Sequence, residues 1–203
     1  MNESTPIHVI KLGGSLLTLS DLVARFEAFC AQYLTGDGLL VVGGGEPAET
    51  VRFFDRHVGF DETTGHWLAI RAMQFNAHLV AKALPDCTLI HTLEECHAVW
   101  TNEQLAIVDP LAWLIDEEHA GRGVPHRWQF TSDSIAAYAA KRLSASRLTL
   151  LKSTSARADC TLQYAAARQI VDAHLPKAAA DVPNVELVNL RDDSMQGHDL
   201  IAR

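Results

Sequence analysis

Two short apolar runs that each end in consecutive glycines constrain the fold of this chain more than any other feature. Ile7–Leu12 leads into Gly13-Gly14, and Leu39–Val42 leads into the triple glycine 43–45. Apolar runs of this length are typical of strands buried on both faces of a parallel sheet. Because glycine has no β-carbon, such turns can bring backbone amides close to an anion. The pattern predicts two buried strands whose ends bind phosphate, although each turn alone would also fit a purely structural role.

The rest of the chain continues the alternation of strand and helix. Apolar residues recur at helical spacing in segments 22–33, 67–84, 132–143 and 161–174, and Glu46-Pro47 opens another helix. Four further runs are typical of strands: Thr88–His91, Ala106–Val108, Leu148–Leu151 and Val185–Leu190. This order predicts an α/β fold, a three-layer α/β/α sandwich around an open, mainly parallel sheet.

Composition and charge exclude several classes of protein. A hydrophobic fraction of 48% is ordinary for a globular chain, and the net charge of -8 argues against a general nucleic-acid binder. No apolar stretch reaches transmembrane length, and no secretory signal is apparent, so we expect a cytoplasmic protein without membrane contact. The four cysteines form no C-x-x-C pair, and His91, Cys96 and His97 match no standard zinc spacing, so we expect no protein-bound metal site.

Two lysines and one aspartate carry the expected chemistry. Lys11 ends the first strand and Lys152 ends a later one, while Asp133 stands at the start of a predicted helix. Flanking cations stabilise the negative charge that a transferred phosphoryl group spreads over its oxygens. Asp133 can orient both lysines through charge-assisted hydrogen bonds, and it can also cap its helix. Spacing alone would class the lysines as surface residues more often than as catalytic ones.

At these residues the chain resembles the amino acid kinase superfamily. Four motifs occur in the order of that group: Lys11-Leu-Gly-Gly-Ser15, Val42-Gly-Gly-Gly45, Thr131-Ser-Asp-Ser-Ile-Ala-Ala137 and Leu150-Leu-Lys152. The resemblance implies one domain over residues 1–203, with an acceptor-binding lobe at 1–120 and a nucleotide-binding lobe at 121–203. It further implies direct in-line transfer from ATP, with Mg²⁺ carried by the phosphates, to a small-molecule substrate.

The resemblance also assigns roles to individual residues. Lys11 and Lys152 would stabilise the transition state, and Asp133 would organise them. The nucleotide would be bound by Gly13, Gly14, Ser15, Gly44, Gly45, Lys152 and Ser153, and the acceptor by Gly44, Gly45, Arg71 and Ser132. Arg71 fits an anionic substrate group, but it equally fits a solvated helix face. A homo-oligomer is the usual state of such proteins.

Within the superfamily, the chain is similar to the small kinases of one-carbon cofactor biosynthesis. Its compact size and the run Trp128-x-x-Thr-Ser-Asp-Ser-Ile-Ala-Ala resemble the aminomethylfuran phosphate kinase subgroup, which implies a furan monophosphate as acceptor. One departure concerns the stretch after Lys152. Ser153–Asp159 stands where many relatives have an Asp-x-Asp-Gly loop that holds the nucleotide. A non-catalytic nucleotide or anion sensor, or a storage protein on the same fold, is therefore the alternative function.

Overall fold

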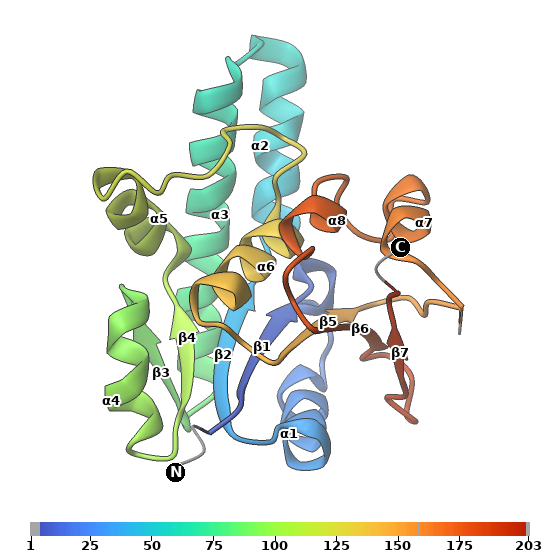
Figure 1. Ribbon diagram of the computed structural model, residues 1–203. Helices are drawn as coiled ribbons and strands as arrows, with labels where there is room; N and C mark the ends of the chain where they lie inside the picture. Colours follow the sequence, from blue (N-terminus) through green and yellow to red (C-terminus); the bar gives the residue numbers. More distant parts are fainter. Residues whose placement is uncertain (1–4, 158, 202–203) are drawn as a thin grey trace.

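The computed structural model describes residues 5–157 and 159–201, which build one twisted sheet flanked by helices (Figure 1). The strands are β1 (Ile7–Leu12), β2 (Asp37–Val42), β3 (Cys87–Ile90), β4 (Leu105–Val108), β5 (Arg147–Lys152), β6 (Asn184–Asn189) and β7 (Gly197–Asp199). Their spatial order is β3-β4-β2-β1-β5-β6-β7, and every neighbouring pair is parallel except β6 with β7. The predicted open, mainly parallel sheet is confirmed.

The helices are α1 (Leu22–Tyr33), α2 (Gly45–Val58), α3 (Glu62–Ala83), α4 (Cys96–Trp100), α5 (Pro110–His119), α6 (Ser132–Arg142), α7 (Leu162–Ala167) and α8 (Leu175–Ala178). Short 3₁₀ turns occur at Gly14–Leu16 and Leu93–Glu95. In the part of the chain that the structure describes, no helix combines the length and the apolar character needed to cross a bilayer.

Helices cover both faces of the sheet because the strand side chains alternate between them. Val9 of β1 packs in one core cluster with Ile135 of α6, whereas Ile10 packs in a second cluster with Phe29 of α1. Because consecutive strand residues point to opposite faces, each central strand contributes to both cores. This arrangement confirms the three-layer sandwich.

The same alternation directs the two lysines toward α6. Lys11 is two residues beyond Val9, and Lys152 is two residues beyond Leu150, which lies in the same cluster as Val9. In the parallel pairing of β1 with β5, Lys11 stands opposite Leu150, so the two lysines leave neighbouring strand ends on one face. Register and strand period therefore bring together two cations that are far apart in the sequence.

The two glycine turns touch each other at the carboxyl edge of the sheet. The Gly43 amide donates to the Leu12 carbonyl at 2.9 Å, which joins the ends of β1 and β2. A β-carbon on Gly14 would lie 2.1 Å from the Gly45 nitrogen, and Gly45 itself has a left-handed φ of 49°. Glycine is therefore needed at these positions for the close contact between the two turns.

One predicted element is wrong in extent. The segment 161–174 was expected to be a single helix, but α7 ends at Ala167 and α8 begins at Leu175. Gln169 adopts a left-handed φ of 58°, which stops helix propagation, and Asp172 then accepts hydrogen bonds from the first turn of α8. Local side-chain bonding has replaced the helix that the apolar spacing favoured.

Replacing Gly14 by alanine is expected to lower the free energy of unfolding by about 3 kcal/mol, because the new methyl group meets rigid backbone. Gly121→Ala is the matched control: Gly121 has a φ of 72° but nothing within 4 Å of an added β-carbon, so only strain of about 1 kcal/mol is expected. Urea denaturation measures both. Equal losses in the two variants would contradict close contact between the glycine turns.

Candidate active site

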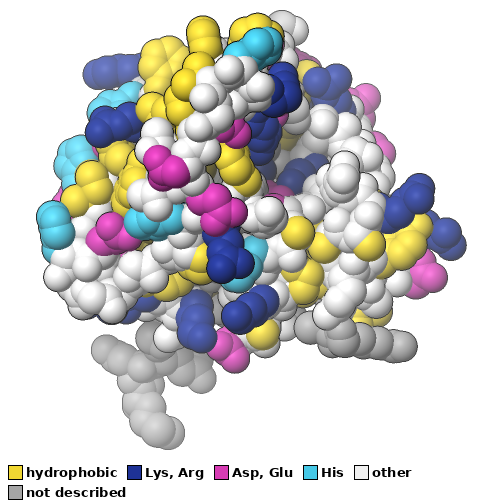
Figure 2. All heavy atoms as spheres, turned by 90° about the horizontal axis from the view of Figure 1, so that it is seen from above, with side chains coloured by type: hydrophobic (Ala, Val, Ile, Leu, Met, Phe, Trp, Pro, Cys, Tyr) yellow, Lys and Arg dark blue, Asp and Glu magenta, His cyan; other side chains and the backbone are white. Residues whose placement is uncertain are grey.

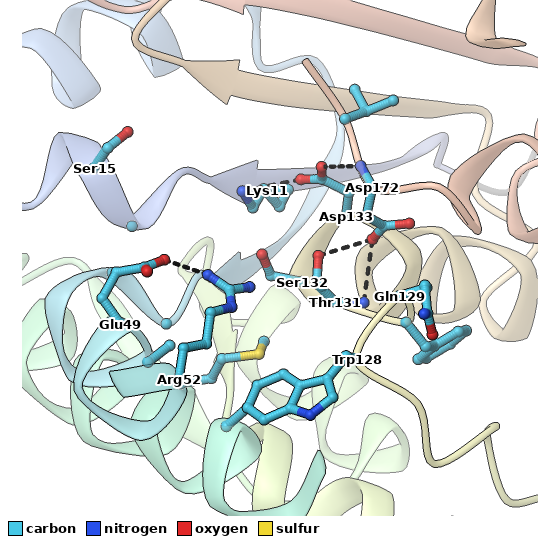
Figure 3. A pocket seen from close by; sticks show the side chains of 18 of the residues that line it. Lys11, Ser15, Glu49, Arg52, Trp128, Gln129, Thr131, Ser132, Asp133 and Asp172 are labelled. Atoms are coloured by element: carbon cyan, nitrogen blue, oxygen red, sulfur yellow. Dashed lines mark hydrogen bonds and ion pairs between the residues drawn. The ribbon is translucent and has the colours of Figure 1, made fainter. Parts of the chain in front are cut away.

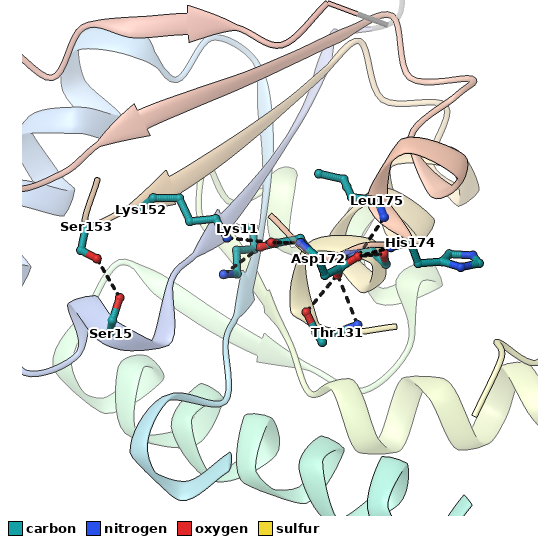
Figure 4. Close-up of polar contacts among 10 residues, drawn as sticks. Lys11, Ser15, Thr131, Lys152, Ser153, Asp172, His174 and Leu175 are labelled. Carbon is teal, nitrogen blue, oxygen red and sulfur yellow. Dashed lines mark hydrogen bonds and ion pairs between the residues drawn. The ribbon is translucent and has the colours of Figure 1, made fainter. Parts of the chain in front are cut away.

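The side chains of Lys11 and Lys152 lie side by side (Figure 4), and both contact the carboxylate of Asp133, which is labelled in Figure 3. The Lys11 Nζ lies 2.9 Å from Asp133 Oδ1, and the Lys152 Nζ lies 2.6 Å from Oδ2. Asp133 is buried in the first turn of α6, which is the end of a helix that favours negative charge. The structure thus brings together the three residues that the sequence singled out as catalytic.

Burial and mutual attraction set the charges of this triad. Desolvation, reinforced by repulsion from Lys152, lowers the pKa of Lys11 to about 8, although the attraction of Asp133 opposes the shift. Burial alone would raise the pKa of Asp133, but Lys11 and Lys152 hold it well below its ordinary value. Asp133 is therefore ionised at neutral pH, and one carboxylate faces two ammonium groups. The remaining positive charge favours an anion.

Asn76 of α3 fixes the orientation of the second glycine turn. Its buried Nδ2 donates to the Gly43 carbonyl at 2.7 Å. In a planar trans peptide, the carbonyl and the following N–H point in opposite directions, so the Gly44 amide is turned away from Asn76. Gly44 lines the cavity beside the lysines. The buried Asn76 side chain thus helps to orient the Gly44 N–H as a hydrogen-bond donor.

A cavity of about 840 Å³ opens at this edge of the sheet, and the surface is hollowed there with Lys and Arg atoms in its wall (Figure 2). Its lining comes from both halves of the chain, including β1, α2, α3, α6 and the segment before α8. The charged residues in the lining are Lys11, Glu46, Glu49, Arg52, Arg127, Asp133, Lys152 and Asp172. Four of these residues are basic and four are acidic, so any attraction for a phosphorylated ligand is local to the basic groups.

Asp172, which was not predicted as a site residue, connects the Asp133 carboxylate to the chain beyond α7. Its backbone amide donates to Asp133 Oδ2 at 3.1 Å. Its side chain accepts from the Thr131 and Ser134 amides at the start of α6, and from the His174 and Leu175 amides at the start of α8. The residue lay inside a predicted helix, so no sequence signal identified it.

The remaining predicted site residues divide into two groups. Gly14, Ser15, Gly44, Gly45 and Ser132 line the cavity together with the triad. Gly13, Arg71 and Ser153 are outside the lining: the Gly13 amide bonds to the Leu151 carbonyl, Ser153 contacts the Ser15 hydroxyl at 3.2 Å, and Arg71 is exposed. The structure therefore does not bring Arg71 to the cavity.

Arg52, His66 and Trp128 also line the cavity, and none of them was predicted as a site residue. Arg52 and Trp128 lie on the side away from Lys11 and Asp133 (Figure 3). Arg52 of α2 is paired with Glu49, and its guanidinium lies 5.8 Å from the centre of the Trp128 ring. His66 is buried in the wall, its Nε2 finds no hydrogen-bond partner among the described residues, and burial lowers its pKa to about 4. The neutral imidazole of His66 and the guanidinium of Arg52, which is paired with Glu49, thus both line the cavity.

Replacing Asp133 by asparagine is expected to destabilise the protein by about 3 kcal/mol, because the buried Lys11 and the partly buried Lys152 lose their counter-charge. Lys141 and Asp181 provide the control, since they form an equally short but exposed pair at 2.6 Å. Asp181→Asn should change the free energy of unfolding by less than about 1 kcal/mol. Similar values for both variants in urea denaturation would show that the buried triad is not strongly coupled.

Comparisons with known proteins agree with this geometry. A sequence profile of the amino acid kinase family matches residues 6–156. A curated relative from Methanocaldococcus jannaschii, "[5-(aminomethyl)furan-3-yl]methyl phosphate kinase", is 28% identical over 137 residues. The aligned region is 68% of this chain and 61% of that relative, so the match spans less than two thirds of its length.

Solved structures share the fold at low sequence identity. Uridylate kinase from Archaeoglobus fulgidus superposes with a TM-score of 0.61 at 18% identity, covering 89% of both chains. UMP kinase from Ureaplasma parvum gives 0.64 at 15% identity, covering 92% of this chain and 91% of that one. Aspartate kinase from Synechocystis gives a TM-score of 0.71 at 13% identity, covering 97% of this chain and 40% of that one. Since the profile match extends over more than half of the sequence, the chain belongs to the amino acid kinase family of phosphotransferases.

Proposed function

We propose that this protein is a kinase that transfers the γ-phosphoryl group of ATP to a phosphate monoester and so forms a diphosphate. The observation that carries the proposal is the convergence of Lys11 and Lys152 on one buried carboxylate, beside two glycine turns in a single cavity. In this reaction an acceptor phosphate oxygen bonds to the γ-phosphorus. The bond from the γ-phosphorus to its bridging oxygen breaks, and ADP leaves with that oxygen.

The residues act by position and charge rather than by covalent chemistry. The two ammonium groups stabilise the equatorial oxygens of the transferred phosphoryl group, and Asp133 holds both in place. The Gly14, Gly44 and Gly45 amides can approach the phosphates closely, because glycine has no β-carbon to screen its backbone. Mg²⁺ bound to the donor phosphates would neutralise further charge while keeping most of its water ligands.

The donor and the acceptor would occupy opposite ends of the cavity. We place ATP beside Lys152, Asp172 and the turn containing Gln169, and the acceptor between α2 and α3. This corresponds to the nucleotide lobe at 121–203 and the acceptor lobe at 1–120, except that Arg127 and Trp128 lie on the acceptor side. In keeping with the curated relative's name, the acceptor we propose is a furan-type monophosphate.

Purified protein incubated with Mg-ATP and [5-(aminomethyl)furan-3-yl]methyl phosphate is expected to produce ADP and a diphosphate, which ³¹P NMR distinguishes. Lys11→Ala should lower kcat by about 100- to 1000-fold, because one stabilising cation is lost. Lys141→Ala removes an exposed cation outside the cavity and should leave the rate unchanged. ATP binding without transfer to any acceptor would support the sensor alternative, which the altered loop after Lys152 motivates.

The reaction is expected to slow at alkaline pH. Lys11 has its pKa lowered to about 8, so its stabilising charge is present below that pH and is lost as the pH rises through it. The profile of kcat/KM, which reports the free enzyme, should therefore fall above about pH 8. Lys11→Arg keeps the positive charge throughout this pH range and should abolish the fall of kcat/KM above about pH 8. A wild-type profile that stays flat to about pH 10, near the ordinary lysine value, would contradict the assignment.

We further propose that the protein forms a homo-oligomer through α2 and α3. Five large apolar side chains are exposed there by 51–64%: Phe53, Phe54, Val58, Phe75 and Leu79. Light scattering should give a multiple of 22.2 kDa for the wild type and a smaller mass for Phe75→Glu. Tyr164→Glu, on α7, changes an exposed aromatic elsewhere and should not alter the mass. A wild-type mass of one chain would refute the proposal.

A further inference from the structure

A tryptophan from the connection between α5 and α6, Trp128, lines the acceptor end of the cavity. We call residues 120–131 the strap; it passes across α3 and α2 on its way to α6 (Figure 1). The strap is held on α3 at two places. The His126 ring stacks on His66 at 5.0 Å, and a β-carbon on Gly65 would lie 2.7 Å from Trp128 Cζ2. The Trp128 ring can occupy this position only because residue 65 is glycine.

Arg52 helps to hold the same ring from the side of α2. Its guanidinium lies 5.8 Å from the centre of the Trp128 ring, within the range of a cation–π interaction. In Figure 3, Arg52 lies between Glu49 and Trp128, and Trp128 lies across the pocket from Lys11 and Asp133. The ring is therefore a positioned wall rather than a loose surface side chain.

Three residues on one face of α3 give the distance between the Trp128 ring and the glycine turns. Gly65, Ala69 and Met73 are spaced four residues apart and so lie along one helix face. Trp128 covers the first of them, whereas the Met73 Cγ would lie 3.6 Å from a β-carbon on Gly44. Eight residues of α-helix rise by about 12 Å. The space between Trp128 and the phosphate-binding glycines is thus about two helical turns long.

The face of α3 between Trp128 and the glycine turns carries apolar side chains. Ala69, Ile70 and Met73 line the cavity between its two ends. We propose that Trp128 is the specificity-determining residue that limits acceptor length, so that the site admits monophosphates of a single ring or a short chain and excludes long-chain ones. This inference rests on the proposed function, because it takes the glycine turns as the place of the acceptor phosphate.

Calorimetric titration with butyl, hexyl, octyl and decyl phosphate, each below its micelle-forming concentration, tests the limit without requiring turnover. The wild type should bind the shorter esters and bind decyl phosphate at least tenfold more weakly. Trp128→Ala should remove most of this difference, and Trp128→Leu should reduce it. Trp100→Ala is the control, because Trp100 bonds to the Gly38 carbonyl and lies outside the cavity lining. It should keep the length limit of the wild type.

The outcomes separate this inference from the function on which it rests. An unchanged length limit in both Trp128 variants, or equal wild-type binding of all four esters, would overturn the role of Trp128 and leave the kinase proposal intact. Failure of the wild type to bind any of the four esters would contradict the monophosphate acceptor itself, and the length limit with it. Thermal unfolding of Trp128→Leu confirms that the variant used is folded.

Discussion

The rest of the site depends on one buried carboxylate shared by buried Lys11 and partly buried Lys152. Placing an ammonium group in a protein interior is costly unless a counter-charge is near, and Asp133 serves Lys11 and Lys152 at once. Two ammonium groups thus share one carboxylate, which leaves one positive charge within the triad for the phosphate that we propose to bind there.

The fold supplies this arrangement through a few simple constraints. Parallel strands end at the same edge, and the two-residue period of β1 and β5 turns both lysines toward α6. The glycine turns that follow β1 and β2 approach so closely that side chains are excluded from both. Asn76 from α3 then helps to orient the Gly44 amide through the Gly43 carbonyl. Asp172, from the turn before α8, donates its backbone amide to the Asp133 carboxylate. Each of these contacts joins segments that are distant in the sequence.

The central strands could be predicted from local sequence patterns, whereas the role of the lysine pair came from the resemblance to the amino acid kinase superfamily and not from spacing. Strand period and glycine turns can be recognised without knowledge of tertiary contacts. Arg71 shows the limit of such reasoning. It follows buried Ile70 on α3, and the next helical residue points about 100° away from its predecessor, so Arg71 faces solvent. Trp128 and Asp172 lie in irregular segments, where no periodicity indicates which way a side chain points.

We propose that the phosphoryl group passes between the glycine turns while Lys11 and Lys152 flank it. A crystal structure with ADP, Mg²⁺, tetrafluoroaluminate and an acceptor monophosphate measures this directly. We expect planar fluoride density within hydrogen-bonding distance of both ammonium groups and of the Gly44 amide. Density bound elsewhere in the cavity, with Lys11 and Lys152 still paired only to Asp133, would contradict it.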